Sequence, residues 1–357
     1  GGYGDTGFSA FVEQKSMPVV SKDTQKLLKY FRTRAAVRHL QGICRIPDHC
    51  DNVVVIPAMA ERVQLPSTLA SLTKNPAEAL NRTFIVAVVN NPPPPESDTG
   101  GQRYDRILRD NQETLRWLRQ TTFDGLHLAW IDMSSAGEEL PAGKGVGEAR
   151  KTGCDTALHS ISRLLKAHTD IRQKFANTVL FHLDADTRVA PNYLKAARRR
   201  LLTSCCSGGV IAFRHEQPQN RTEAELIRQY EQYLRYVARG LGFAQSPYAY
   251  TSIGSAMVST AEAYIRAGGI PSKRTAGEDF YFLQELAKTG GVCRIDDTEV
   301  YPSARTSMRV PFGTGPHMAS RLRCPGKPLY VYNPRTFDIL SYGTPVLQCR
   351  HGSLGCE

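Results

Sequence analysis

The sequence contains no apolar run near the roughly 18 to 20 residues that a membrane-spanning helix needs, and no secretory signal opens it. Its nine cysteines are an odd number and follow no metal-ligand spacing. Neither a disulfide framework nor a cysteine-based zinc site is therefore expected. Zinc-finger spacing and other nucleic-acid modules are also missing. These absences predict a cytoplasmic globular protein with reduced thiols and no nucleic-acid partner.

The composition is that of a globular protein with an excess of positive charge. With 357 residues, of which 41% are hydrophobic, the chain is long enough for one large α/β domain or two smaller ones. The formal net charge of +11 suits an anionic partner, which can be nucleic acid, a phosphorylated substrate or a membrane surface, and the missing nucleic-acid modules argue against the first. Peripheral contact with a membrane is compatible with this charge.

In the first half of the chain, strands and helices are expected to alternate. Continuous apolar runs predict strands that are buried on both faces, and amphipathic stretches predict the helices between them. This alternation is typical of a parallel, doubly wound sheet. We expect strands at residues 52–57, 83–89, 126–132 and 179–186, helices at 65–72, 104–118 and 146–168, and an outer helix at 21–42.

The regular alternation of strands and helices is not expected to continue in the second half of the chain. The tail from residue 311 is rich in Gly, Pro and Arg, which predicts loops with little regular structure. Before it, we expect strands at residues 209–213, 250–259, 292–295 and 299–301, and helices at 193–202, 222–237 and 278–288.

Two carboxylates, Asp184 and Asp186, stand at the end of the fourth predicted strand. Side chains at positions i and i+2 of an extended segment point the same way, so this pair is expected to converge. Two close carboxylates repel each other unless a cation lies between them, and Mg²⁺ or Mn²⁺ suits oxygen ligands. The alternative is a solvated turn in which Asp186 caps the helix that starts near Pro191.

Other polar residues are expected at the same edge of the sheet, because the carboxyl ends of parallel strands lie together. A glycine-rich loop at residues 142–147 opens the third helix, and such a loop with nearby cations favours a phosphate. A plain flexible loop is the alternative. Together with the carboxylates, the loop predicts a nucleoside diphosphate bridged to a divalent ion. The residues concerned are Pro57, Glu61, Asn90, Asp132, Lys144 and Arg150.

Four segments resemble, in order, the motifs of the family 2 glycosyltransferases, which have the GT-A fold. They are residues 53–61 (VVVIPAMAE), 145–153 (GVGEARKTG), 183–186 (LDAD) and 277–280 (GEDF), and the likeness covers roughly residues 50 to 315. It implies a GT-A-like, Rossmann-type α/β sandwich with a mostly parallel central sheet and an N-terminal helical extension. It also implies a metal-dependent glycosyltransferase of the hexosyltransferase class that uses a nucleotide-sugar donor.

The resemblance also implies roles for particular residues. Glu61 and Asn90 would contact the nucleobase or ribose, and Asp186 would be the main metal ligand, with Asp184 between ribose and metal. Asp279 would be the general base. The sequence departs from the family pattern in two places: Asn90 stands where an acidic residue is frequent, and Lys151 stands where asparagine is usual.

Asp279 suits the base role on chemical grounds, because an attacking hydroxyl must lose its proton to a nearby acceptor. Direct displacement with a single base would invert the anomeric configuration. The alternative is a carboxylate that only complements the N-terminus of a helix. Arg305, Arg309 and His317, on a glycine-rich segment, could fold over the diphosphate, and the resemblance implies that His317 completes the metal site. A basic surface loop is the other interpretation.

We expect a tail and helix at residues 1–48, the glycosyltransferase domain at 49–320 and a loop-rich extension at 321–357. The acceptor is an unknown sugar, glycolipid or polysaccharide. Two other functions remain open. Residues 183–187 (LDADT) also match the signature of haloacid-dehalogenase-type phosphohydrolases, in which Asp184 would be the nucleophile. The chain could also be a nucleotide-binding domain without activity.

Overall fold

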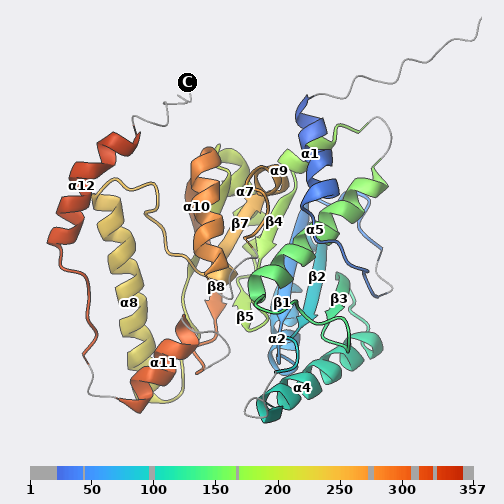
Figure 1. Ribbon diagram of the computed structural model, residues 1–357, viewed down its shortest axis with the longest axis horizontal. Coiled ribbons are helices and arrows are strands. Elements are labelled where there is room, and N and C mark those ends of the chain that lie inside the picture. Colours follow the sequence, from blue (N-terminus) through green and yellow to red (C-terminus); the bar gives the residue numbers. More distant parts are fainter. Residues whose placement is uncertain are drawn as a thin grey trace, which may run out of the picture.

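The computed structural model describes residues 22–42, 45–95, 101–165, 169–271, 277–306, 313–324 and 328–348 (Figure 1). At its centre is an eight-stranded mixed sheet with the strand order β3-β2-β1-β4-β7-β6-β8-β5. The strands are β1 (Asn52–Ala58), β2 (Thr83–Asn90), β3 (His127–Met133), β4 (Val179–His182), β5 (Thr187–Val189), β6 (Gly208–Phe213), β7 (Met257–Thr260) and β8 (Val292–Pro302).

The first four strands are adjacent and parallel, as predicted. Every residue of β1 and β2 is buried, which explains their unbroken apolar sequences. The chain moves outward from β1 to β2 and β3 and then returns to place β4 on the other side of β1. This reversal creates a topological switch point between β1 and β4, and a crevice is expected at their carboxyl ends.

The second half of the sheet is mixed. β7 is antiparallel to both β4 and β6, β8 is parallel to β6, and β5 is antiparallel to β8. Of the predicted strand at residues 250–259, only β7 forms, after a 3₁₀ turn (Gly254–Ala256). The two short strands predicted at 292–295 and 299–301 are one strand, β8, with a register irregularity opposite Ile211 and Ala212.

Helices cover both faces of this sheet. On one face, α5 (Val146–Leu164) packs on β1 and β2 and contacts α10 (Glu278–Gly290). On the other face lies α7 (Tyr193–Thr203), which packs on β7 and β8. Side chains of β4 alternate between the two layers: the ring of Phe181 lies 5.1 Å from that of Tyr193, and the ring of His182 lies 5.3 Å from that of Phe282 in α10.

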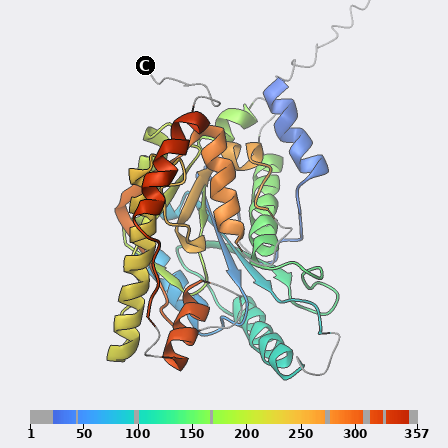
Figure 2. The same ribbon diagram turned by 60° about the vertical axis from the view of Figure 1, so that its left-hand side comes forward.

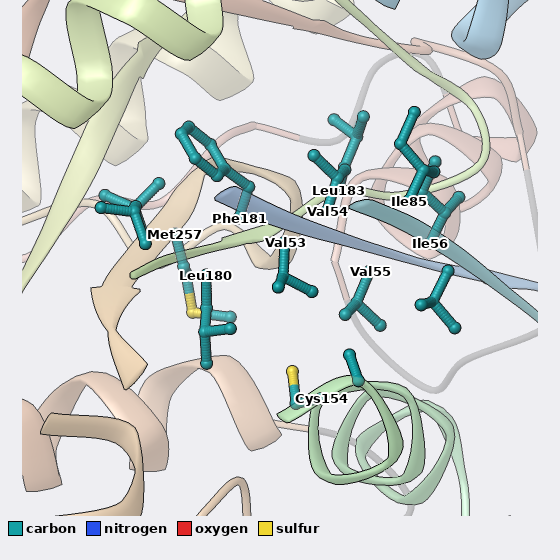
Figure 3. Close-up of a cluster of buried hydrophobic side chains, with 14 of the residues drawn as sticks. Val53, Val54, Val55, Ile56, Ile85, Cys154, Leu180, Phe181, Leu183 and Met257 are labelled. Atoms are coloured by element: carbon teal, nitrogen blue, oxygen red, sulfur yellow. The ribbon is translucent and has the colours of Figure 1, made fainter. Parts of the chain in front are cut away.

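A glycine allows α5 to approach the sheet closely. A Cβ atom on Gly153 would lie 2.4 Å from Cγ1 of Val55, closer than two carbon atoms can approach. Figure 3 shows Val53, Val55 and Leu180 on the side of the strands that faces Cys154 of the same helix. The position of α5, and of the glycine-rich loop before it, is therefore set by tight packing on β1.

Five shorter or peripheral helices complete the main body. α2 (Gln64–Leu72) and α4 (Gly101–Gln120) match the predicted helices in the first half, whereas the other three, each of four to six residues, were not predicted. These are α3 (Ala77–Leu80), α6 (Ile171–Ala176) and α9 (Ala261–Arg266). None of the described helices is long and apolar enough to cross a membrane.

The N-terminal helix is shorter than predicted. α1 (Lys22–Thr33) ends at Thr33, so the prediction of a helix through residue 42 is wrong. The backbone after Thr33 is bound to α5 instead of continuing the helix. The N–H of Ala36 donates to the Asp155 carboxylate (2.7 Å), and the N–H of Arg38 donates to the Thr156 hydroxyl (3.0 Å). Further on, Gln41 forms a β-bridge with Trp130 at the edge of β3.

A buried network fixes α1 against the main body. Asp155 is fully buried and accepts hydrogen bonds from the hydroxyls of Tyr30 (2.7 Å) and Tyr264 (2.9 Å). The Lys151 ammonium pairs with the same carboxylate and lies 5.2 Å from the Tyr30 ring centroid. Because every member has a partner, the network rigidly joins α1, α5 and α9.

The tail is more regular than predicted. Instead of loops, it forms α11 (Thr314–Arg323) and α12 (Arg335–Gln348), both packed on α8 (Arg221–Phe243). The prolines of the tail do not prevent these helices, because Pro316 lies in the first turn of α11 and Pro334 directly before α12, where a missing N–H costs little. Figure 2 shows α12 alongside α8, to which Phe337 anchors it by its tight contact at Gly240.

Candidate functional site

The predicted site residues meet at the carboxyl edge of the sheet, at the switch point. Glu61 follows the end of β1, and Asp184 and Asp186 follow the end of the adjacent strand β4. Pro57 lies within β1, and Asn90 ends β2 on the other side of it. The prediction that these residues share one edge is therefore confirmed.

The two aspartates do not project from an extended strand as expected. β4 ends at His182, and the N–H of Thr187 donates to the carbonyl oxygen of Asp184 (3.1 Å), which closes a turn. The prediction that an extended strand runs through both aspartates is therefore wrong, because the chain must turn back into β5. Each carboxylate is bonded by a different arginine.

Arg150 joins two of the predicted motifs. Its guanidinium is almost fully buried, pairs with the carboxylate of Asp184, and donates through Nε to Oε1 of Glu278 (3.3 Å). Burial lowers the pKa of Arg150, but Asp184, Glu278 and Asp279 outweigh it and raise the pKa above the ordinary arginine value. The Nη1 atom of Arg150 is buried and has no hydrogen-bond partner among the described residues.

Gly254 packs directly on this ion pair. A Cβ atom at this position would lie 2.7 Å from Nη2 of Arg150 and 3.7 Å from Oδ2 of Asp184. The 3₁₀ turn before β7 therefore covers the pair, and only glycine leaves the guanidinium its place. Sequence reasoning gave Gly254 no role, although it lies among the small residues of the segment 250–259.

Arg305 joins two further predicted residues. Its Nη2 donates to Oδ2 of Asp186 (2.9 Å) and to Oε1 of Glu61, while Nε donates to the same Asp186 oxygen (3.2 Å). The side chain of Glu61 is 5% exposed and that of Asp186 21% exposed. Burial lowers the pKa of Arg305, and Glu61 and Asp186 together raise it above the ordinary value.

Asp279 lies at the start of α10, next to the buried Glu278. Burial raises the pKa of Asp279, the hydrogen bond from the Phe280 N–H (2.7 Å) and the Arg150 charge oppose this, and the net shift is upward. The pKa of Glu278 is also raised, by burial first and by Asp279 in part. Burial, followed by the charge of Asp279, raises the pKa of Tyr230 in α8.

Of the other predicted residues, Lys144 precedes α5 and His317 lies in α11. Lys144 pairs with Glu148 one turn into α5 (3.5 Å). The ring of His317 in α11 stacks on Tyr230, with centroids 4.3 Å apart, and burial followed by the Arg321 charge lowers the His317 pKa. Arg309 lies outside the described residues.

The donor atoms at this edge suit a divalent cation. Carboxylate oxygens are the ligands that Mg²⁺ and Mn²⁺ prefer, and Mg²⁺ is frequently held by one or two carboxylates together with substrate phosphates. The guanidinium of Arg305 shows that Glu61 and Asp186 can reach one cation together. Within the described ranges, no three His, Cys, Asp or Glu side chains form a metal site, so His317 is not grouped with the aspartates.

No protein-family model and no curated protein matches this chain. Solved structures match at low identity. The S. aureus TarS fragment 1-349 in complex with UDP-GlcNAc is 15% identical, with a TM-score of 0.45, over 81% of this chain and 64% of the TarS chain. This chain thus spans less than two thirds of that structure. The mannosyltransferase PcManGT from Pyrobaculum calidifontis, in complex with GDP-Man and Mn²⁺, is 14% identical, with a TM-score of 0.40, over 92% of this chain and 84% of the other. GalNAc-T7 with UDP, GalNAc and Mn²⁺ is 14% identical, with a TM-score of 0.40, over 77% and 49%.

Proposed function

We propose that the chain is a glycosyltransferase that moves a sugar from a nucleotide-diphosphate donor to an acceptor hydroxyl with inversion. The observation that carries this proposal is the ion-pair set around Arg150. It connects three of the four motifs on which the resemblance rests, through Arg150, Asp184 and Glu278, although these residues are far apart in the sequence. Chance motif matches would not be expected to meet at one switch point.

The donor would lie in the crevice beyond β1, β2 and β4. Asn90 supports this placement, because its Oδ1 atom is buried without a hydrogen-bond partner among the described residues and can accept an N–H from a nucleobase. Lys144, at the N-terminus of α5, would face the phosphates, where the helix dipole also favours an anion. Pro57, Glu61, Arg150, Asp184 and Arg309 complete the proposed donor contacts.

We further propose that a divalent ion, Mn²⁺ or Mg²⁺, is held by Asp186 and Glu61 together with the diphosphate of the donor, with Asp184 and His317 as the further ligands that the resemblance implies. Such an ion, when bound, neutralises the charge that develops on the leaving diphosphate. The residues of the chain hold Glu61 and Asp186 within reach of one cation. Arg150 meanwhile keeps the charge of Asp184 compensated.

Asp279 would accept the proton of the attacking hydroxyl. Its raised pKa makes it a better proton acceptor than an ordinary aspartate, provided that it is ionised. Tyr230 and α8 would line the acceptor side, because the charge of Asp279 acts on Tyr230 and raises its pKa. The acceptor class, a sugar, glycolipid or polysaccharide, and a cytoplasmic location are part of the proposal, and the net charge of +11 supports an acceptor on an anionic surface.

The test begins with a thermal-shift screen of nucleotide sugars with and without Mn²⁺, since a donor that binds the folded state raises Tm. With the donor found, Asp279→Asn is compared with Glu285→Gln, a change to an exposed residue of the same helix paired with Lys288. We expect transfer to fall about 10²- to 10⁴-fold in the first variant and to persist in the second. Unchanged transfer in Asp279→Asn, or metal-dependent phosphate release from simple monoesters, would refute the assignment.

A further inference from the structure

A cavity of about 620 Å³ lies between α1, α6 and α9. Ligand sites have volumes of roughly 300 to 1,000 Å³, so a small molecule or a headgroup fits it. Five of the residues that line it are cationic, whereas Glu262 is the one acid among the lining residues that the structure describes. The cations are Lys26, Lys29, Arg34, Arg172 and Arg266.

Glu262 compensates only one of these charges, because it pairs with Arg172 (Nε to Oε1, 3.0 Å). Within the described part of the chain, Lys29, Arg34 and Arg266 form no ion pair, and all three are exposed. Concentrated, uncompensated positive charge around a concave surface raises the local concentration of anions. The floor is apolar, formed by the buried side chains of Leu27, Tyr30 and Ile265.

The cavity is separate from the candidate active site. It adjoins α6, which precedes β4, and α9, which follows Thr260, the partner of Val179 at the beginning of β4. Asp184 and Asp186 follow the opposite end of the same strand. Figure 1 accordingly shows α1 and α9 at the top of the molecule and α2 and β5 lower down.

The walls of the cavity are held in place. The Tyr30 and Tyr264 hydroxyls both donate to Asp155, so α1 and α9 are fixed to the same buried carboxylate of α5. A cavity with preorganised walls loses less entropy on binding than one formed by mobile loops.

We propose that this cavity binds a phosphate group, carried either by a soluble compound or by the headgroup of an anionic lipid. Lys29, Arg34 and Arg266, which form no ion pair among the described residues, line it, and the planar arginine fork matches phosphate geometry. Its apolar floor would contact the carbon part of the ligand. This binding site does not depend on the proposed transferase activity.

The experiment compares three forms of the full chain. Lys29→Glu with Arg266→Glu reverses one charge on each wall. Lys74→Glu with Arg200→Glu reverses two exposed cations outside the cavity and makes the same change in net charge. Inorganic pyrophosphate binding is measured by calorimetry. Vesicle binding is measured by flotation, with phosphatidylcholine vesicles that contain or lack phosphatidylglycerol.

We expect the cavity variant to bind at least one probe about tenfold or more weakly than the wild type, since each cation near a charged surface contributes measurably, while the control variant stays close to the wild type. Loss confined to pyrophosphate identifies a soluble phosphate ligand, and loss confined to vesicles identifies a lipid headgroup. Equal losses in both variants, or no cavity-dependent binding of either probe, overturn the proposal. The same comparison with Lys29→Gln and Arg266→Gln guards against misfolding of the reversed variant.

Discussion

Replacing Arg305 by glutamine tests whether this guanidinium stands at a cation site. The change leaves Glu61 and Asp186 facing each other without the positive charge that both now share. Because both oxygens bond one nitrogen, they lie within about 6 Å of each other. At an effective dielectric constant of about 20, the repulsion between them is roughly 3 kcal/mol.

The side chain of Arg305 is 31% exposed, so solvent reduces this cost. In EDTA at neutral pH we expect Arg305→Gln to lose about 1 to 3 kcal/mol of unfolding free energy, below the value for a fully buried pair. The assay is thermal unfolding with increasing Mn²⁺. We expect the variant to bind Mn²⁺ at least about tenfold more tightly than the wild type, because no guanidinium competes for the carboxylates, and to regain stability as Mn²⁺ binds.

Arg214→Gln serves as the matched control. Arg214 pairs with Glu299 on the surface, where its side chain is 65% exposed. We expect no measurable change in stability and no change in the response to Mn²⁺. If Arg305→Gln and the wild type respond equally to Mn²⁺, or if Arg214→Gln gains the same stabilisation, Glu61 and Asp186 do not form a cation site.

Three further predictions concern the packing of the site, the network that holds α1, and the titration of Asp279. In Gly254→Ala the new methyl group displaces Arg150, so we expect the unfolding free energy measured in urea to fall by about 1 to 3 kcal/mol and the nucleotide-sugar donor to bind more weakly. The control is Gly242→Ala, in which the nearest atom to the new methyl group is 3.8 Å away. We expect this variant to keep the stability and the donor binding of the wild type. Asp155→Asn leaves a buried lysine uncompensated, and we expect a loss of about 3 to 5 kcal/mol by the same measurement; a loss under about 1 kcal/mol would contradict the role of the network. Because the pKa of Asp279 is raised and a base must be ionised, kcat/KM should fall as pH drops through a value above 3.8, and an acid limb at or below 3.8 would exclude Asp279 as the base.

The first half of the fold is predictable because its strands are buried on both faces. The runs at β1 and β2 contain little besides apolar residues, so their length and position follow from the sequence alone. In contrast, β7 has four residues, among them Ser259 and Thr260, and its antiparallel place between β4 and β6 leaves no local signal. The end of α1 depends on hydrogen bonds to Asp155, which is distant in the sequence.

The candidate site also has a part that the sequence predicts and a part that it does not. Glu61, Asp184 and Asp279 lie just after a predictable strand or at the start of a predictable helix. The partners of these residues were not predictable, because an ion pair between positions 244 residues apart, such as Glu61 and Arg305, produces no periodicity. The turn at Asp184 was also missed, since the short strand β5 that requires it has three residues.

Arg305 becomes available to Glu61 and Asp186 only late in the synthesis of the chain. Arg305 follows Asp186 by 119 positions, which a ribosome adding about 5 to 20 residues per second takes roughly 6 to 24 s to complete. Throughout that interval the nascent chain carries Glu61 and Asp186 without their guanidinium. Strands β1 to β4 can pair early, but Glu61 and Asp186 at their edge cannot form their ion pairs until Arg305 has been synthesised. Assembly of the charge-balanced centre is therefore coupled to the synthesis of β8 and the residues that follow it.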